Sequence, residues 1–142
     1  MKTNNGLIEM ELKRIVIDEM RLEQVVVLKE RNGERVLPIV IGAAEVTAIK
    51  MEVSGIRPQR PMTHDLLKEM ICSLGARLER VLIDGLKENT FYAKLHLTND
   101  KEAQVIIDAR PSDSIALAIR THAPIFVAQE VLDKIGKVDE DK

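Results

Sequence analysis

Polar and apolar residues alternate at the beginning of the chain, where charged side chains separate Ile8, Met10 and Leu12. Successive side chains of a β-strand point to opposite faces, so this period of two predicts a strand with one wet face. Two β-branched runs at residues 25–29 and 35–41 predict two further strands. The N-terminal part is therefore expected to begin a sheet.

The second and third of these strands are expected to form a hairpin. Between them lies Asn32-Gly33, a dipeptide that readily adopts positive φ and favours a tight type I′ turn. Pro38 lies within the third strand and cannot donate a backbone hydrogen bond to a neighbouring strand. We expect Pro38 at a sheet edge or beside a bulge.

Apolar residues spaced three and four apart predict two helices in the middle of the chain. The first covers residues 43–53 and ends at Ser54-Gly55. Thr63 is the expected N-cap of the second. The apolar stripe of this second helix is predicted to lie in the core and consists of Leu67, Met70, Ile71 and Leu74.

The second half of the chain begins with three predicted strands joined by short turns, at residues 78–86, 90–97 and 103–109. Short links between consecutive strands indicate an antiparallel meander. A third helix is expected from Pro111, and its run 115–119 is apolar nearly all round, which is typical of a deeply buried helix. A short strand at 124–128 and a helical turn or two at 129–135 follow.

These elements predict an α+β fold, with a mostly antiparallel twisted sheet of six to seven strands and three main helices. A chain of 142 residues has the usual size of one domain. We expect this domain to cover residues 1–134, followed by a charged, disordered tail at 135–142.

The composition narrows the classes of partner. Lys and Arg number 21 against 23 Asp and Glu, and with only one Tyr, two Phe and no Trp the chain lacks a stacking platform for bases. Any contact with nucleic acid is thus expected at backbone phosphates. No apolar run is long enough to span a membrane, Cys72 is the single cysteine, and the start shows no signal pattern. We expect a cytoplasmic protein that does not enter membranes.

A repeated pattern marks the beginning of two predicted helices. Arg60 and Arg110 each precede a proline, and a hydroxyl residue and an aspartate follow at the helix start. The following residues are Thr63 with Asp65, and Ser112 with Asp113. Free N–H groups at a helix start bind phosphate, to which the arginine adds a bidentate contact. Alternatively, Thr63 and Ser112 cap their helices and the aspartates interact with the helix dipole.

Asp108 makes the second of these helix starts a candidate metal site. It ends a predicted strand five residues before Asp113, and two carboxylates suit Mg²⁺ or Mn²⁺. Such a metal could activate water and offset charge on phosphorus, with Arg110 sharing that charge. The alternative is a structural salt bridge between Asp108 and Arg110. His64 is either a general acid or base or a surface residue of the first helical turn.

The other chemically reactive side chains carry weaker signals. His96 and His122 have no partner at zinc-ligand spacing, and Cys72 has no catalytic signature. Glu45 lies near the start of the first helix, where a carboxylate suits the helix dipole; a metal or partner role is the lesser alternative. The sequence contains no P-loop, dinucleotide fingerprint or nucleophile elbow.

Four segments together resemble the bifunctional nuclease domain family over about residues 7 to 132. They are Leu37-Pro38-Ile39-Val40-Ile41-Gly42 leading to Glu45, Arg60-Pro61-Met62-Thr63-His64-Asp65-Leu66-Leu67, Phe91-Tyr92-Ala93-Lys94-Leu95, and Asp108-Ala109-Arg110-Pro111-Ser112-Asp113-Ser114-Ile115-Ala116-Leu117-Ala118. The resemblance implies an α+β fold, self-association and an ability to degrade DNA and RNA. Two positions depart from typical members, which often have a large aromatic at Val40 and a glycine at His122.

Two hypotheses follow. The first is a nuclease that hydrolyses DNA and RNA with little sequence preference, assisted by Mg²⁺ or Mn²⁺ and acting as a homo-oligomer, a dimer being favoured. Its catalytic residues are Asp108, Arg110, Asp113 and His64. Its substrate-binding residues are Arg60, Thr63 and Ser112, and its metal ligands are Asp108, Asp113 and Asp65. The second is a non-catalytic oligomeric module that binds a small anion or a protein partner at the same helix ends.

Overall fold

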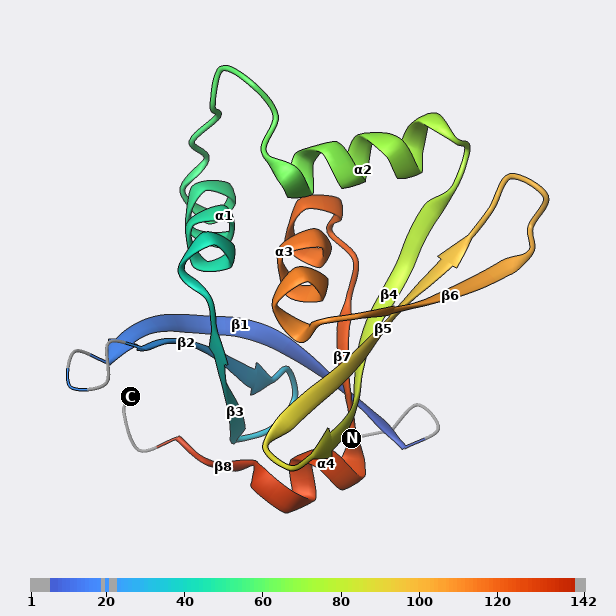
Figure 1. Ribbon diagram of the computed structural model, residues 1–142. Coiled ribbons are helices and arrows are strands. Elements are labelled where there is room, and N and C mark those ends of the chain that lie inside the picture. The colour runs from blue at the N-terminus through green and yellow to red at the C-terminus, as the bar shows by residue number, and fades with distance from the viewer. Residues whose placement is uncertain (1–5, 19, 21–22, 140–142) are drawn as a thin grey trace.

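The computed structural model describes residues 6–18, 20 and 23–139, which form one eight-stranded sheet and four helices (Figure 1). The strands are β1 Leu7–Asp18, β2 Glu23–Glu30, β3 Arg35–Ile41, β4 Arg77–Lys87, β5 Thr90–Thr98, β6 Gln104–Ala109, β7 Ile125–Ala128 and β8 Lys137–Val138. The helices are α1 Ala43–Ser54, α2 Thr63–Ser73, α3 Pro111–Thr121 and α4 Gln129–Ile135. The predicted α+β class with a mostly antiparallel sheet is confirmed.

The strand order is β6-β5-β4-β7-β1-β2-β3-β8. The β4–β5–β6 meander forms one half of the sheet, and β1, β2 and β3 form most of the other. Between them lies β7, which runs parallel to β4 and antiparallel to β1. Its Ile125 and Val127 are buried, so this four-residue strand joins the two halves through backbone ladders and through the core.

The predicted β2–β3 hairpin is confirmed, but its type I′ turn is wrong, because neither Asn32 nor Gly33 has a positive φ. A side chain holds this connection, since the Arg35 backbone N–H donates to Glu30 Oε1 at 2.9 Å. Two consecutive positive φ values occur instead at Glu88 and Asn89, which join β4 to β5. The turn whose backbone twist matches that of its flanking strands therefore joins β4 to β5, not β2 to β3.

The ordered fold extends further toward the C-terminus than the sequence predicted. Lys137–Val138, expected in a disordered tail, forms β8 and pairs with Arg35 and Val36 of β3. The following Asp139 is buried, and Arg14 Nη2 lies 2.8 Å from its Oδ1. Because β8 covers only the first two residues of β3, Pro38 lies on a part of β3 that β8 leaves unpaired, as its missing N–H requires.

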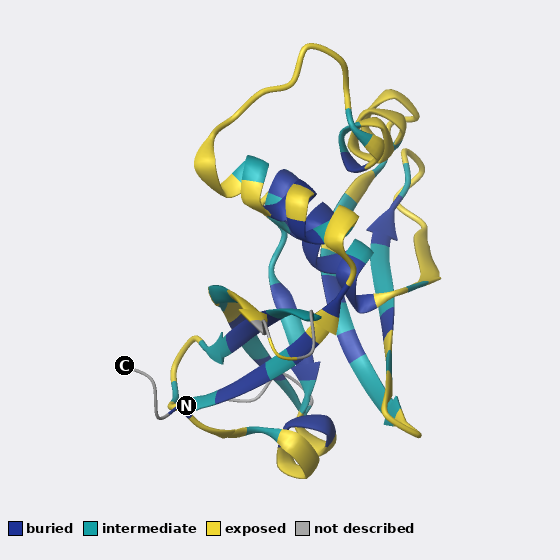
Figure 2. Ribbon diagram, turned by 60° about the vertical axis from the view of Figure 1, so that its left-hand side comes forward, coloured by how far each residue is buried: buried dark blue, intermediate teal, exposed yellow. Residues whose placement is uncertain are grey.

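Helix α3 occupies the middle of the helical layer. It contacts α1 on one side, α2 on the other, and β4 and β5 of the sheet (Figure 1). Its run from Ser114 to Ala118 is buried, and Figure 2 shows α3 dark along most of its length. The deep burial predicted for this helix is confirmed. None of the helices in the described residues is both long and apolar enough to cross a membrane.

The apolar stripe of α2 is not in the core, contrary to prediction. Within this helix, whose residues are all described, His64 alone is buried, and Leu74 keeps 73% of its surface exposed. Leu66, Leu67 and Met70 are exposed too. The helix packs on α3 and on the start of β4. An apolar periodicity shows that a helix has an apolar face, but it does not show whether the same chain covers that face.

The end of α3 explains why a glycine would suit residue 122. His122 follows the helix with φ 62° and ψ 29°, and the backbone N–H there donates to Ala118 O. This left-handed conformation is strained for a residue with a Cβ. We expect His122→Gly to raise the free energy of unfolding by about 1 kcal/mol. Urea midpoints would measure this. As a control, Lys50→Gly, at an exposed position inside α1, should lower it by about 1 kcal/mol; equal effects of the two substitutions would contradict the explanation.

Candidate active site at the start of helix α3

The turn from β6 into α3 builds the site. Arg110 is the N-cap with extended backbone, and Pro111 occupies the first helical turn, where its fixed φ suits a helix and its missing N–H has no partner to lose. The Ser114 backbone N–H and Oγ both donate to Arg110 O, at 3.0 and 2.9 Å. This turn presents the Arg110 and Asp113 side chains together, as the sequence predicted for a helix start.

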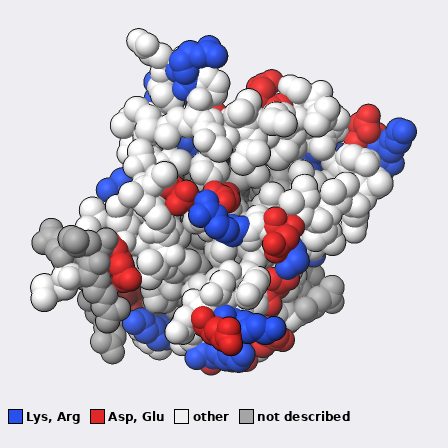
Figure 3. All heavy atoms as spheres, viewed as in Figure 1, with Lys and Arg blue, Asp and Glu red and all other residues white. Residues whose placement is uncertain are grey.

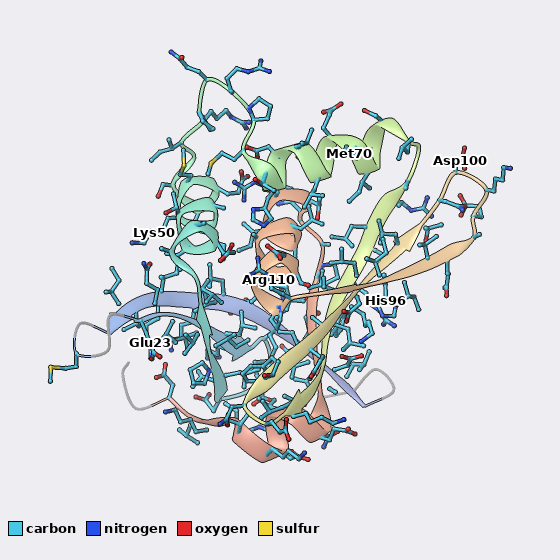
Figure 4. All side chains as sticks on the ribbon, viewed as in Figure 1. Glu23, Lys50, Met70, His96, Asp100 and Arg110 are labelled. Atoms are coloured by element: carbon cyan, nitrogen blue, oxygen red, sulfur yellow. The ribbon has the colours of Figure 1, made fainter. Side chains whose placement is uncertain are left out.

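Three helices bring four side chains together here, and we call this set the Asp113 cluster: Glu45, His64, Arg110 and Asp113. Asp113 Oδ1 lies 3.0 Å from His64 Nε2 of α2, and Asp113 Oδ2 lies 2.9 Å from Arg110 Nε. Arg110 Nη2 in turn lies 3.3 Å from Glu45 Oε2 of α1. Figure 4 places Arg110 at the start of α3, and Figure 3 shows basic atoms flanked by acidic ones at that position.

The Asp113 cluster runs from the interior to the surface. The His64 side chain is 7% exposed, whereas that of Arg110 is 66% exposed. Burial alone would raise the pKa of Asp113, but hydrogen bonds from Arg110 and His64 outweigh burial and hold that pKa below its ordinary value. Asp113 is therefore ionised at neutral pH, and His64 Nε2–H donates to it. Such a carboxylate suits the binding of cations better than the uptake of a proton.

Asp65 belongs to a separate ion pair. Arg120 Nε, on the buried side chain of α3, lies 2.7 Å from Asp65 Oδ1. Asp65 Oδ2 accepts the Met62 backbone N–H at 2.9 Å, and this bond, followed by that from Arg120, lowers the pKa of Asp65. Met62, rather than the predicted Thr63, is thus the N-cap of α2. Asp65 fixes the start of α2 against α3, and this positions His64.

Asp108 lies on the face of the sheet that points away from α3. It is paired with Lys94 in the β5–β6 ladder, and Lys94 Nζ lies 3.6 Å from its Oδ1 and 3.4 Å from Asp84 Oδ2. The neighbouring Ala109 pairs with buried Ala93 on the helical side. Because side chains alternate along a strand, Asp108 and Asp113 are held by different cations and do not form one ligand pair.

The remaining predicted residues divide between the surface and the core. Arg60 is exposed in the loop between α1 and α2, Thr63 is exposed at the first residue of α2, and Ser112 is buried in α3. In the described part of the chain, no group of three or more His, Cys, Asp or Glu side chains is arranged to hold a metal ion. The structure therefore unites His64, Arg110 and Asp113 and separates Asp65 and Asp108 from them.

The sequence analysis underestimated the role of Glu45 in the candidate site and did not identify Arg120. Glu45 was assigned mainly to the dipole of its helix, yet it binds Arg110 across 65 residues of sequence. Its position directly after the Leu37–Gly42 motif was the available signal. Arg120 lies in the last turn of α3 and is buried, and a buried arginine requires an anionic partner, which here is Asp65.

Comparisons with known proteins identify the family of the chain. A family model described as the bifunctional nuclease domain matches residues 26–140. An uncharacterized protein of Mycobacterium tuberculosis is 40% identical over 134 residues, which cover 94% of this chain and 79% of that protein. Bifunctional nuclease 2 of Oryza sativa subsp. japonica is 30% identical over 114 residues, 78% of this chain but 35% of the plant protein. Bifunctional nuclease 2 of Arabidopsis thaliana is 29% identical over 105 residues, 72% of this chain and 32% of that protein. The chain belongs to the bifunctional nuclease domain family.

Proposed function

We propose that the protein hydrolyses phosphodiester bonds in DNA and RNA at the Asp113 cluster. The observation that carries this proposal is the exposed Arg110 guanidinium, which two carboxylates hold at a helix start in front of a buried histidine. A guanidinium fixed at a helix start is suited to bind two oxygens of a phosphate. The family to which the chain belongs, and the names of its plant relatives, point to the same chemistry.

In this reaction Arg110 binds the non-bridging oxygens of the phosphodiester and offsets the charge that develops on them. The oxygen of a water forms a bond to phosphorus, the bond from phosphorus to one sugar oxygen breaks, and that sugar oxygen gains a proton as the water loses one. His64 is a positioning residue, because its buried ring touches Asp113 and fixes the direction of that carboxylate.

The charge of the Asp113 cluster supports assistance by a divalent cation. Two carboxylates oppose one guanidinium, so an anionic phosphate needs further positive charge to approach. We propose Mg²⁺ or Mn²⁺, which bind through one or two carboxylates together with water and substrate oxygens. Glu45 and Asp113 fit this need, since both contact the same guanidinium. A bound ion would supply an activated water and charge neutralisation.

Contacts with nucleic acid are proposed at phosphates. The exposed loop between α1 and α2 carries Arg57 and Arg60, and Thr63 begins the helix that follows. Contacts of this kind do not read bases, so little sequence preference is expected, and binding should weaken steeply with added salt. We assign the protein to the cytoplasm, where the exposed free thiol of Cys72 stays reduced.

Self-association is the last part of this proposal. The described residues include a group of large apolar side chains that face solvent on α2 and β6, namely Leu66, Leu67, Met70, Leu74, Val105, Ile106 and Ile107. Large apolar side chains that one chain leaves exposed are typical of an interface. We propose a homo-oligomer, with a dimer as its simplest form.

The proposed activity predicts cleavage of both nucleic acids that depends on a divalent ion. Protein freed of contaminating nucleases should cut single-stranded DNA and RNA, lose the activity by about 100-fold or more with EDTA, and recover it with Mg²⁺ or Mn²⁺. Gel-resolved cleavage of labelled oligonucleotides would measure this. Salt-sensitive binding without cleavage would favour a non-catalytic anion-binding module, and cleavage that is indifferent to EDTA would exclude the metal.

A further inference from the structure

A hollow of about 580 Å³ lies on the face of the sheet that points away from α3. Val81 of β4 is buried in the core, so its neighbour Arg80 points to the opposite face, where it pairs across the ladder with His96 of β5. Figure 4 shows His96 on the meander, apart from Arg110 at the start of α3. We call this space the Arg80 hollow, and the lining residues that matter here are Arg80, His96, Thr98, Gln104, Ile106 and Phe126.

Arg80 carries a charge that no carboxylate neutralises within the described part of the chain. Its guanidinium lies 5.7 Å from the centre of the Phe126 ring, and it forms no ion pair there. Arg77 of the same strand differs, because Glu79 holds it at 2.7 Å and Glu102 at 3.2 Å. The aromatic ring thus positions the Arg80 guanidinium, while its N–H groups remain available to an acceptor that enters the hollow.

Three neutral donors border the same hollow. The His96 ring has no hydrogen-bond partner among the described residues. Thr98 and Gln104 pair with each other across the β5–β6 ladder, and they add a hydroxyl and an amide. One unpaired cation beside several neutral donors is an arrangement suited to an anion with several oxygens.

We propose that the Arg80 hollow binds the phosphate group of a small phosphomonoester, a class that includes nucleoside monophosphates. A phosphate has three terminal oxygens, which can accept from the guanidinium and from neutral donors at once, whereas a carboxylate has two. The hollow has the size of a small-molecule site, and Ile106, Pro124 and Phe126 would contact the uncharged part of the molecule. The proposed site does not depend on nuclease activity, because the Asp113 cluster lies on the other side of the sheet.

Lys94 is not the group that would bind the phosphate. It lies one pair further along the β5 ladder, and its Nζ is 3.4 Å from Asp84 Oδ2 and 3.6 Å from Asp108 Oδ1. Two carboxylates therefore already neutralise this cation. The positive charge that remains for a ligand on this part of the sheet is that of Arg80.

The titration of His96 should report the bound anion. Burial, followed by the charge of Arg80, holds the pKa of His96 below its ordinary value; Asp84 opposes this shift, and Lys94 adds to it. Asp108 of β6 is held by the same Lys94. An anion beside the ring favours the protonated form, so sulfate should raise the pKa of His96 and bind more tightly as the pH falls. Sulfate is a suitable probe because its own charge stays constant while imidazole titrates.

The chain contains three histidines, which serve as separate probes in nuclear magnetic resonance spectra. His96 borders the Arg80 hollow, His64 belongs to the Asp113 cluster, and His122 follows α3. Added inorganic phosphate should shift the ring signals of His96 until the site is saturated. Adenosine monophosphate should reach the same end point at a concentration at least about 10-fold lower, because its uncharged part adds contacts. Acetate should bind more weakly than phosphate.

Substitutions of Arg80 test the assignment. Arg80→Gln should weaken phosphate binding at His96 by about 10-fold or more, since it removes charge-assisted hydrogen bonds. Arg80→Lys keeps the charge but loses the planar fork, so it should weaken binding by about 3- to 10-fold. Arg57→Gln is the matched control, because it removes an exposed arginine far along the chain, and it should change the affinity by less than about 2-fold. Unchanged His64 and His122 signals would show that each variant is folded.

The outcomes separate clearly. A saturable His96 response that Arg80→Gln removes and Arg57→Gln leaves intact supports the proposed site. A response confined to His64, a His96 response that survives Arg80→Gln, or an equal loss in both variants overturns it. Equal affinities for phosphate and adenosine monophosphate overturn the assignment to a phosphomonoester. Loss of nuclease activity in Arg110→Gln with an unchanged His96 response would leave the Arg80 hollow in place.

Discussion

Asp113→Asn is expected to lower the rate of phosphodiester cleavage by about 100-fold or more while the protein stays folded. Asparagine keeps the size of the side chain, and its one oxygen can still accept a hydrogen bond from either His64 or Arg110. It removes the negative charge that balances Arg110 and that would bind a divalent ion. The free energy of unfolding should change by about 1 kcal/mol. Initial cleavage rates at saturating Mg²⁺, together with urea unfolding curves, would measure both quantities.

Asp108→Asn is the matched control for this substitution. The sequence proposes both aspartates as metal ligands, but Asp108 lies on the opposite face of the sheet beside Lys94. Its replacement is therefore expected to change the cleavage rate by less than about 3-fold, the size of a modest surface contact. A variant set in which Asp108→Asn is inactive and Asp113→Asn is active would move the site to the face that carries Lys94.

Ile115→Ala is expected to lower the free energy of unfolding by about 2 to 5 kcal/mol, because Ile115 is fully buried in the middle of α3. Met70→Ala on α2 removes a side chain of similar size that faces solvent, and it should cost less than about 1 kcal/mol in the monomer. Urea midpoints at protein concentrations low enough to avoid self-association would measure both. Equal losses for the two variants would mean that the α2 stripe is covered within one chain.

Local patterns were sufficient to predict most elements of the fold. Alternation and short turns predicted the β4–β5–β6 meander, and Pro111 before an apolar run predicted α3 and its burial. The central place of β7 was not predictable in this way, because its partners β1 and β4 lie far away in sequence. Whether the apolar stripe of α2 is buried was also not predictable, since periodicity does not show which surface covers the stripe.

The candidate site was likewise predictable only where its residues are close in sequence. Arg110 and Asp113 lie three residues apart at a helix start, so the sequence could unite them. His64 and Asp113 meet across 49 residues, and no spacing rule connects them. The sequence predicts Asp108 beside Asp113 because Asp108 ends a strand five residues before it. The three successive apolar positions 105–107 of β6 hide which face of the sheet Asp108 occupies. Only pairing with β5 shows which face Asp108 occupies.

The position of β7 has a consequence for folding order. This strand pairs with β1 on one side and with β4 on the other, yet it ends at residue 128 of 142. During synthesis on the ribosome, β1 and β4 each have one edge that stays without its partner strand until β7 has emerged. The two halves of the sheet are therefore joined late, and the edges of β1 and β4 are places where a nascent chain is open to mispairing or to a chaperone.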